Sequence, residues 1–104
     1  MQLVTLKLVT VVGEAIIMDD IAERGMKLGA SGHTMTEVMG HGSRSARNVA
    51  TAGGAKTIKL EFVVSERVAH DIMAFVAEQY LEHYAIIAWL SDVSVMRGEE
   101  YVRE

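Results

Sequence analysis

The stretch Thr57-Ile58-Lys59-Leu60-Glu61-Phe62-Val63-Val64-Ser65-Glu66 joins a strand pattern directly to a helix start. Its even positions from 58 to 64 are apolar while 57, 59 and 61 are polar, the period of two that a half-buried strand shows. Ser65 suits a helix N-cap, and Glu66 is favourable beside the positive end of a helix. Apolar residues then recur with helical spacing at Val68, Ile72, Phe75, Val76 and Tyr80. This predicts an amphipathic helix to about His83.

The N-terminal half repeats the order of strand and helix. Residues 1–12 predict a strand whose inward face carries the even apolar positions, Val4, Leu6, Leu8 and Val12. Residues 18–28 have the spacing of an amphipathic helix, and Gly29 is placed to end it as a left-handed cap. Residues 33–39 predict a second strand and residues 85–96 the last one, followed by a charged tail, 97–104.

This order of elements predicts one α+β domain over residues 1–104 with a ferredoxin-like βαββαβ fold. Both helices are expected on one face of an antiparallel sheet, which leaves the other face uncovered. We expect Leu3, Val9, Val11 and Val63 on that uncovered face, which makes it partly apolar. The hypothesis is a homo-oligomer that packs these faces together. The alternative is a monomer with scattered surface apolar residues.

Composition excludes several classes of protein. The formal net charge of −4 argues against a general binder of nucleic acid or of acidic membranes. The absence of cysteine excludes disulfides and thiolate metal sites, and no apolar run reaches the roughly 18 residues of a membrane span. The four histidines lack close metal-ligand spacing, and no acid/base pair or nucleophile set is placed by spacing. We therefore expect a cytoplasmic, non-enzymatic protein without direct membrane insertion.

A charge asymmetry marks the long loop between the second and third predicted strands. No acidic residue lies between Glu37 and Glu61, whereas four basic ones do: Arg44, Arg47, Lys56 and Lys59. The segment Gly40-His41-Gly42-Ser43-Arg44-Ser45 combines two glycines, hydroxyls and a guanidinium, groups that suit an oxyanion. It lacks the spacing of a Walker motif. The plain alternative is a solvated loop without a ligand.

Three segments resemble PII signal-transduction proteins. Residues Gly32-His33-Thr34-Met35-Thr36-Glu37-Val38-Met39-Gly40-His41-Gly42 look like the family's second strand, of type G-[YM]-T-V-T-E-V-K-G-F-G. Lys59-Leu60-Glu61-Phe62-Val63-Val64 is similar to the strand K-I-E-I-V-V that follows the family's T-loop. Ser91-Asp92-Val93 and Arg97-Gly98-Glu99 resemble its closing strand and its R-x-G-E segment. The resemblance spans nearly the whole chain in the right order.

The resemblance implies a homotrimer that binds adenine nucleotides in clefts between subunits and signals to a partner protein through its T-loop. By position, Thr34 would lie beside the adenine or ribose and Val63 would line the adenine pocket. Ser43 and Arg44 are candidates for the phosphates, and Arg97 stands near the place of the family's C-terminal arginines. The nucleotide-binding candidates are Thr34, Gly40, His41, Gly42, Ser43, Arg44, Val63, Tyr84 and Arg97.

Two departures from the family pattern refine this expectation. The family's Gly- and Lys-rich turn before the last strand is here Leu81-Glu82-His83-Tyr84, which removes its main triphosphate cradle. The short T-loop, residues 43–56, has no tyrosine for uridylylation. Both departures resemble the SbtB and carboxysome-associated branch linked to inorganic carbon. That likeness implies AMP or ADP as ligand and a membrane transporter or carboxysome-related partner, with Arg47, Asn48 and Lys56 able to surround bicarbonate.

Two other classes share this architecture. A CutA-type trimer would bind divalent metal or serve a structural role, although no histidine or carboxylate spacing in the sequence supports it. A small ferredoxin-like enzyme would turn over an acyl or phosphoryl substrate. An acylphosphatase-type enzyme needs an arginine in the loop after the first strand, where this chain has Gly13-Glu14.

Overall fold

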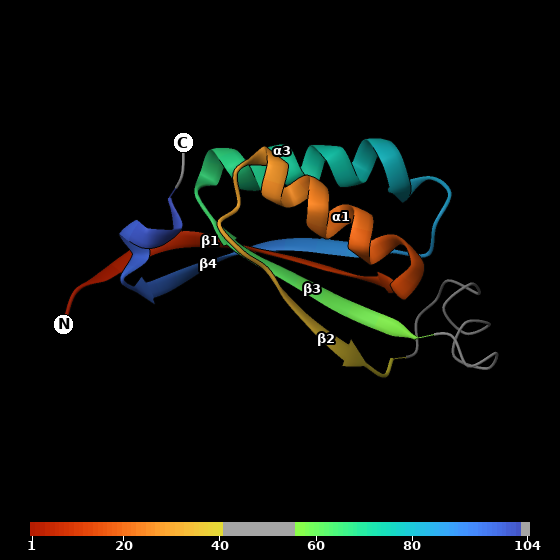
Figure 1. The fold of residues 1–104 in the computed structure, drawn as a ribbon, viewed down its shortest axis with the longest axis horizontal. Coiled ribbons are helices and arrows are strands. Elements are labelled where there is room, and N and C mark those ends of the chain that lie inside the picture. The colour runs from red at the N-terminus through yellow and green to blue at the C-terminus, as the bar shows by residue number, and fades with distance from the viewer. Residues whose placement is uncertain (41–55, 103–104) are drawn as a thin grey trace.

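A computed structural model of the chain describes residues 1–40 and 56–102 (Figure 1). The strands are β1 (Leu3–Glu14), β2 (Thr34–Val38), β3 (Thr57–Val64) and β4 (Ile87–Met96). The helices are α1 (Ala15–Leu28) and α3 (Glu66–Val76), and α3 runs on into a π-helix, η1 (Ala77–Leu81). A 3-10 helix, η2 (Gly98–Tyr101), follows β4. No helix in these described ranges is long and apolar enough to cross a bilayer.

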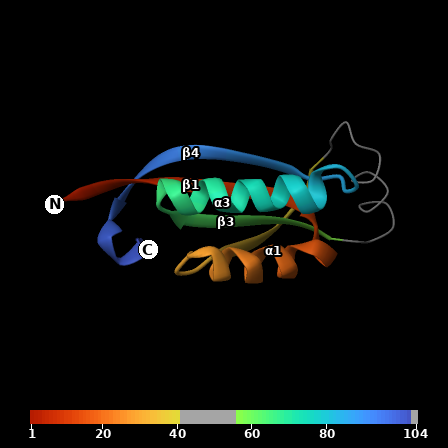
Figure 2. The ribbon, with the colours of Figure 1, turned by 90° about the horizontal axis from the view of Figure 1, so that it is seen from above.

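The strands form one sheet in the order β2-β3-β1-β4, with every neighbouring pair antiparallel. Both helices lie on the same side of it (Figure 1). Seen from the helix side, α3 lies over β1, and α1 lies beside α3, on the far side of β3 from β1 (Figure 2). The predicted ferredoxin-like arrangement is therefore confirmed. Neither α1 nor α3 covers the opposite sheet face, called the open face below, although Gly98 of η2 packs against Val4 at one end of it.

The core lies between the two helices and the sheet. Phe62, Leu60 and Val64 are fully buried on the inner face of β3, as the alternation in the sequence predicts. On β1 the predicted parity is wrong, because Val9 and Val11 are the buried core residues and pair with Phe62 and Leu60. Residues that pair directly across two strands share a face of the sheet. Both parities of β1 are apolar, so only its pairing with β3 determines which set enters the core.

The open face is partly apolar, but its residues are only in part those expected. Val63 lies there as predicted and pairs with Leu8 of β1. Along its other edge β1 pairs with β4, where Thr10 lies opposite Trp89 on the same open face. Trp89 keeps 43% of its surface exposed, and Ile87 keeps 47%. A sheet face that stays in water is usually more polar than this. The expectation of a partly apolar uncovered face is confirmed, although Leu3, Val9 and Val11 lie on the other face of β1.

Helix ends follow the sequence closely. The Ser65 hydroxyl accepts a hydrogen bond from the Val68 N–H at 3.3 Å, which makes it the N-cap of α3. Gly29 ends α1 at φ 130°, a conformation that favours glycine. The predicted second helix ends at Leu81 rather than His83, the last strand begins at Ile87, and the tail contains η2, which no pattern in the sequence predicts.

We expect Ser65→Ala to lower the free energy of unfolding by about 1 kcal/mol, because a free N–H would remain in the first turn of α3. In a chain of this size that loss corresponds to a melting temperature about 4–8 °C lower. Thermal unfolding followed by circular dichroism measures it. The exposed Ser94, which caps no helix, provides the control Ser94→Ala. Equal melting temperatures for the two variants would contradict the capping role.

Candidate functional site

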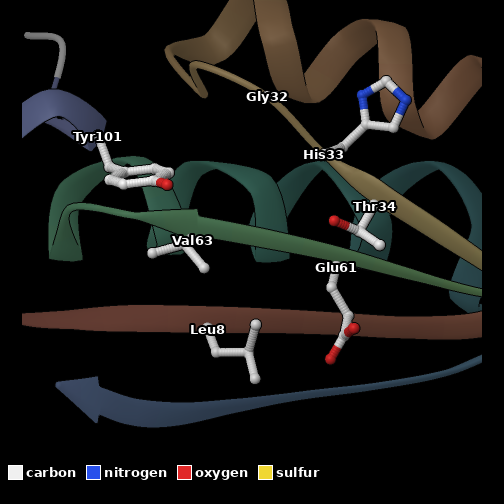
Figure 3. Close-up of a pocket in the computed structure, with 7 residues that line it drawn as sticks. All are labelled: Leu8, Gly32, His33, Thr34, Glu61, Val63 and Tyr101. Atoms are coloured by element: carbon white, nitrogen blue, oxygen red, sulfur yellow. The ribbon is translucent and has the colours of Figure 1, made fainter. Parts of the chain in front are cut away.

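A cavity of about 290 Å³ opens on the open face near the β2 edge of the sheet (Figure 3). We call it the edge pocket. Its lining comes from β1, β3, the start of β2 with the segment that leads into it, and η2. The lining residues are Leu8, Gly32, His33, Thr34, Glu61, Val63 and Tyr101. The volume is near the lower end of the roughly 300–1,000 Å³ typical of small-molecule pockets.

Strand register brings these residues together. Leu8 pairs directly with Val63, and Thr34 pairs with Glu61. Glu61 and Val63 are two residues apart on β3, so their side chains stand on the same face. Four side chains from three separate strands therefore form one continuous group. The rigidity of three paired strands fixes their mutual positions.

The chemistry of the edge pocket is largely apolar with a few polar groups. Leu8 and Val63 supply aliphatic surface, Glu61 a carboxylate and Thr34 a hydroxyl, while the Tyr101 ring borders the pocket from η2 (Figure 3). The His33 ring points toward α1 instead, and packs edge-on against Phe62 with ring centroids 6.3 Å apart. Such a pocket suits a flat, ring-shaped group that presents hydrogen-bond donors at its rim.

Two of the predicted nucleotide-binding residues, Thr34 and Val63, lie together in the edge pocket. Gly40 follows the far end of β2 and does not line it. Lys56 also lies away from it, since β3 places residue 56 five positions from Glu61, about 17 Å along the strand. The Lys56 ammonium pairs with the Glu37 carboxylate at 3.3 Å, with both side chains exposed.

Tyr84 and Arg97 also lie apart from the edge pocket within one chain. Tyr84 follows η1 and packs against Tyr80, with ring centroids 5.3 Å apart. Arg97 is exposed, at a left-handed φ of 57°, and directly precedes η2. The other predicted residues, His41, Gly42, Ser43, Arg44, Arg47 and Asn48, lie outside the described residues.

Several lining residues are absent from the candidates that the sequence suggests. Glu61 stands inside a segment already singled out, as the polar residue beside Val63 on the same face. Leu8 is missed because the sequence predicts the even positions of β1 to face the core. Tyr101 gives no local signal, since its position depends on where the chain turns after β4. The described residues contain no group of three or more histidine and carboxylate side chains that could hold a metal ion.

An aromatic row joins α1 to the end of α3. Phe75 and Tyr80 pack edge-to-face at 5.8 Å, and the Arg24 guanidinium lies 4.7 Å from the Phe75 ring centroid. The Tyr80 hydroxyl donates a hydrogen bond to Asp20. Burial, reinforced by this hydrogen bond and the negative charge of Asp20, raises the pKa of Tyr80 to about 12. The row fixes the start of the turn that contains Tyr84.

We expect stability to fall between pH 10 and 12 partly through Tyr80. Its pKa is about 12 when folded and about 10 in an unfolded chain. The contribution is therefore complete below pH 10 and is lost as the pH rises through 12. Tyr80→Phe should lose less stability over this range than the original protein. In absorbance titrations, the difference between the two proteins should be one tyrosinate that forms near pH 12. A difference with its midpoint near the ordinary tyrosine value of about 10 would contradict the assignment.

Nearly the whole chain matches one protein family. The description of the family Nitrogen regulatory protein P-II matches residues 6–100. No protein with a curated description gives a significant match. A crystal structure of a protein from Thermus thermophilus, described as a PII-like signalling protein, shares 42% identity at a TM-score of 0.83. That alignment covers 98% of this chain and 100% of the other.

Two more distant structures share the fold. CPII from Thiomonas intermedia, bound to ADP, AMP and acetate, aligns at a TM-score of 0.84 with 14% identity, over 99% of this chain and 100% of CPII. The GlnK-ATP complex of B. subtilis aligns at a TM-score of 0.60 with 18% identity, over 86% of this chain and 82% of GlnK. The family match favours a PII-type protein over the CutA-type alternative. The segments that resemble PII strands thus lie within a match of nearly full length, and the chain belongs to the P-II family.

Proposed function

We propose that this protein is a PII-like regulator that binds AMP or ADP, with the adenine ring in the edge pocket. One observation carries the proposal: Thr34 and Val63, selected from sequence as adenine neighbours, line one cavity with apolar surface and a carboxylate. An aliphatic floor removes the ring from water. The hydroxyl and the carboxylate are available to groups at the rim of the base and ribose.

The proposed preference for AMP or ADP over ATP rests on the charge of the residues expected near the phosphates. Phosphate groups need their own donors, most effectively arginine and lysine. The segment from Ala77 to Ile86, which occupies the place of the family's phosphate-binding turn, has no lysine or arginine but contains Glu78 and Glu82. ADP and AMP therefore fit better than ATP. The solved CPII complexes contain ADP with AMP or bicarbonate, which supports this choice by analogy of fold.

We further propose a role in inorganic-carbon regulation, as in the SbtB and carboxysome-associated branch. CPII is described with ADP, AMP and bicarbonate bound. Here Arg47, Asn48 and Lys56 are the candidates for a small anion, with Ser43 and Arg44 toward the phosphates. Lys56 would exchange its exposed ion pair with Glu37 for the anion at little cost. The T-loop would report the bound state to a cytoplasmic partner, such as the cytoplasmic side of a transporter.

A homotrimer is part of the proposal, because the open face leaves Trp89 and Ile87 half exposed. Light scattering should give three times the chain mass of 11.4 kDa. Trp89→Glu should shift the mass toward one chain, since it places a charge in the contact. The exposed Glu23→Gln change on α1 is the control and should leave the trimer intact. A monomeric mass for the unmodified protein would contradict the assembly.

Calorimetric titration tests the ligand. We expect AMP or ADP to bind near one per chain and more tightly than ATP, with cyclic AMP as a further comparison. Bicarbonate should tighten the binding if the anion and nucleotide sites are coupled. Arg44→Ala should weaken the binding of ADP more than that of adenosine, because it removes a hydrogen-bond donor to the phosphates. Tightest binding of ATP would contradict the charge argument, and an absence of binding by every nucleotide would overturn the proposed function.

A further inference from the structure

We propose that Tyr101 is a ligand-binding residue of the edge pocket, and that its ring stacks on the nucleobase. The inference rests on the proposed function, since it requires a base in that pocket. Tyr101 is the aromatic lining residue whose ring borders the cavity, and it faces the aliphatic surface of Val63 and Leu8 (Figure 3). A planar ring held between these surfaces would contact an aromatic face on one side and branched aliphatic groups on the other.

The position of Tyr101 is held by the chain immediately before it. Gly98 is buried against Val4 of β1, where an added Cβ atom would lie 2.5 Å from the Val4 Cβ. Such a contact cannot be accommodated without a shift of η2 or β1. The left-handed Arg97 directs the chain into η2, and the Glu100 N–H donates to the Arg97 carbonyl at 3.0 Å. Only a residue without a side chain at position 98 allows η2 to approach the sheet this closely.

Exposure distinguishes Tyr101 from a core residue. It retains 38% of its surface accessible, whereas the core aromatic residue of β3, Phe62, retains none. The partial exposure of Tyr101 at the mouth of a cavity leaves an aromatic face for a ligand. Stacking between a base and an aromatic ring tolerates any base but requires a flat one.

The test compares AMP with ribose 5-phosphate, which is AMP without its base. Calorimetric titrations use the full protein, Tyr101→Ala, Tyr101→Phe and the control Val102→Ala. Val102 is adjacent, similarly exposed at 39%, and does not line the pocket. We expect Tyr101→Ala to weaken the affinity for AMP about 10-fold or more, because base stacking usually contributes this much to binding. The affinity of Tyr101→Phe and of Val102→Ala for AMP should stay within about twofold of that of the unmodified protein. Ribose 5-phosphate should bind all four proteins with the same affinity.

A second variant tests the anchoring of η2. Gly98→Ala should displace Tyr101 and reproduce the selective loss of AMP, while melting temperature and oligomeric mass confirm that the variants are folded. Equal AMP affinity of Tyr101→Ala and the full protein would overturn the proposal and leave the proposed function standing. Equal weakening of AMP and ribose 5-phosphate would also overturn it, as a general structural effect. Failure of the full protein to bind AMP would overturn both.

Discussion

Phe62→Ala should lower the free energy of unfolding by about 3–5 kcal/mol, the largest stability effect that we expect in this chain. Phe62 is fully buried at the centre of β3, and α1 packs directly on its ring. A Cβ atom added at Gly25 would lie 2.4 Å from that ring, so the helix approaches as closely as it can. Truncation leaves a cavity that α1 and the sheet cannot close without losing other contacts.

Urea unfolding at a fixed chain concentration measures this loss, since an oligomer's stability depends on concentration. Glu23→Gln is the control, because Glu23 is exposed on α1, away from the open face that the homotrimer would cover. Its cost should stay within about 0.5 kcal/mol, as for other surface changes. A loss below about 1 kcal/mol for Phe62→Ala, well under the usual range for a buried aromatic residue, would mean that the contact between α1 and β3 is not the centre of the core.

Val63→Asp should weaken the affinity for AMP and ADP at least about 100-fold, which corresponds to about 2.8 kcal/mol of binding free energy. The new carboxylate would stand in the edge pocket two residues from Glu61 on the same face. It would add a second negative charge and require desolvation when the base enters. It would also repel the anionic ligand. Calorimetry with ADP measures the effect, and circular dichroism with light scattering checks that the fold and the oligomer persist.

Val63→Thr is the control for this change, since threonine keeps the branched shape without a charge. We expect it to retain binding within about tenfold, because one hydroxyl in a pocket that already contains polar groups costs less than a charge. Undiminished ADP affinity in a correctly assembled Val63→Asp variant would show that the base does not enter the edge pocket. Equal losses for both variants would show that the negative charge is not the cause of the weaker binding.

Local patterns suffice for much of this fold. The strand at 57–64, the cap at Ser65 and the left-handed Gly29 each depend on residues within a few positions, and all three are confirmed. The orientation of β1 is different, because apolar residues occupy both of its faces. Its core face is determined by pairing with β3, and that is a contact between segments far apart in the sequence. Alternation within one strand carries no information about such pairing.

The edge pocket is predictable only in part. Thr34 and Val63 lie in segments that resemble known strands, and the antiparallel order of β2 and β3 brings them to one end of the sheet. Leu8 could be placed only with the correct parity of β1. Tyr101 depends on a left-handed Arg97 and on the close approach of Gly98 to Val4, neither of which has a periodic pattern. Contacts made by a turn after the last strand need three-dimensional information.

The most direct test of the central claim is methyl NMR of the isotopically labelled protein during titration with AMP. We predict that the Leu8 and Val63 methyl signals shift as AMP binds, because both side chains line the edge pocket. The methyls of Val68 and Ile72, which belong to α3 and are buried on the other side of the sheet, should shift little. Saturable AMP binding that leaves Leu8 and Val63 unchanged, with its largest shifts elsewhere, would contradict the account.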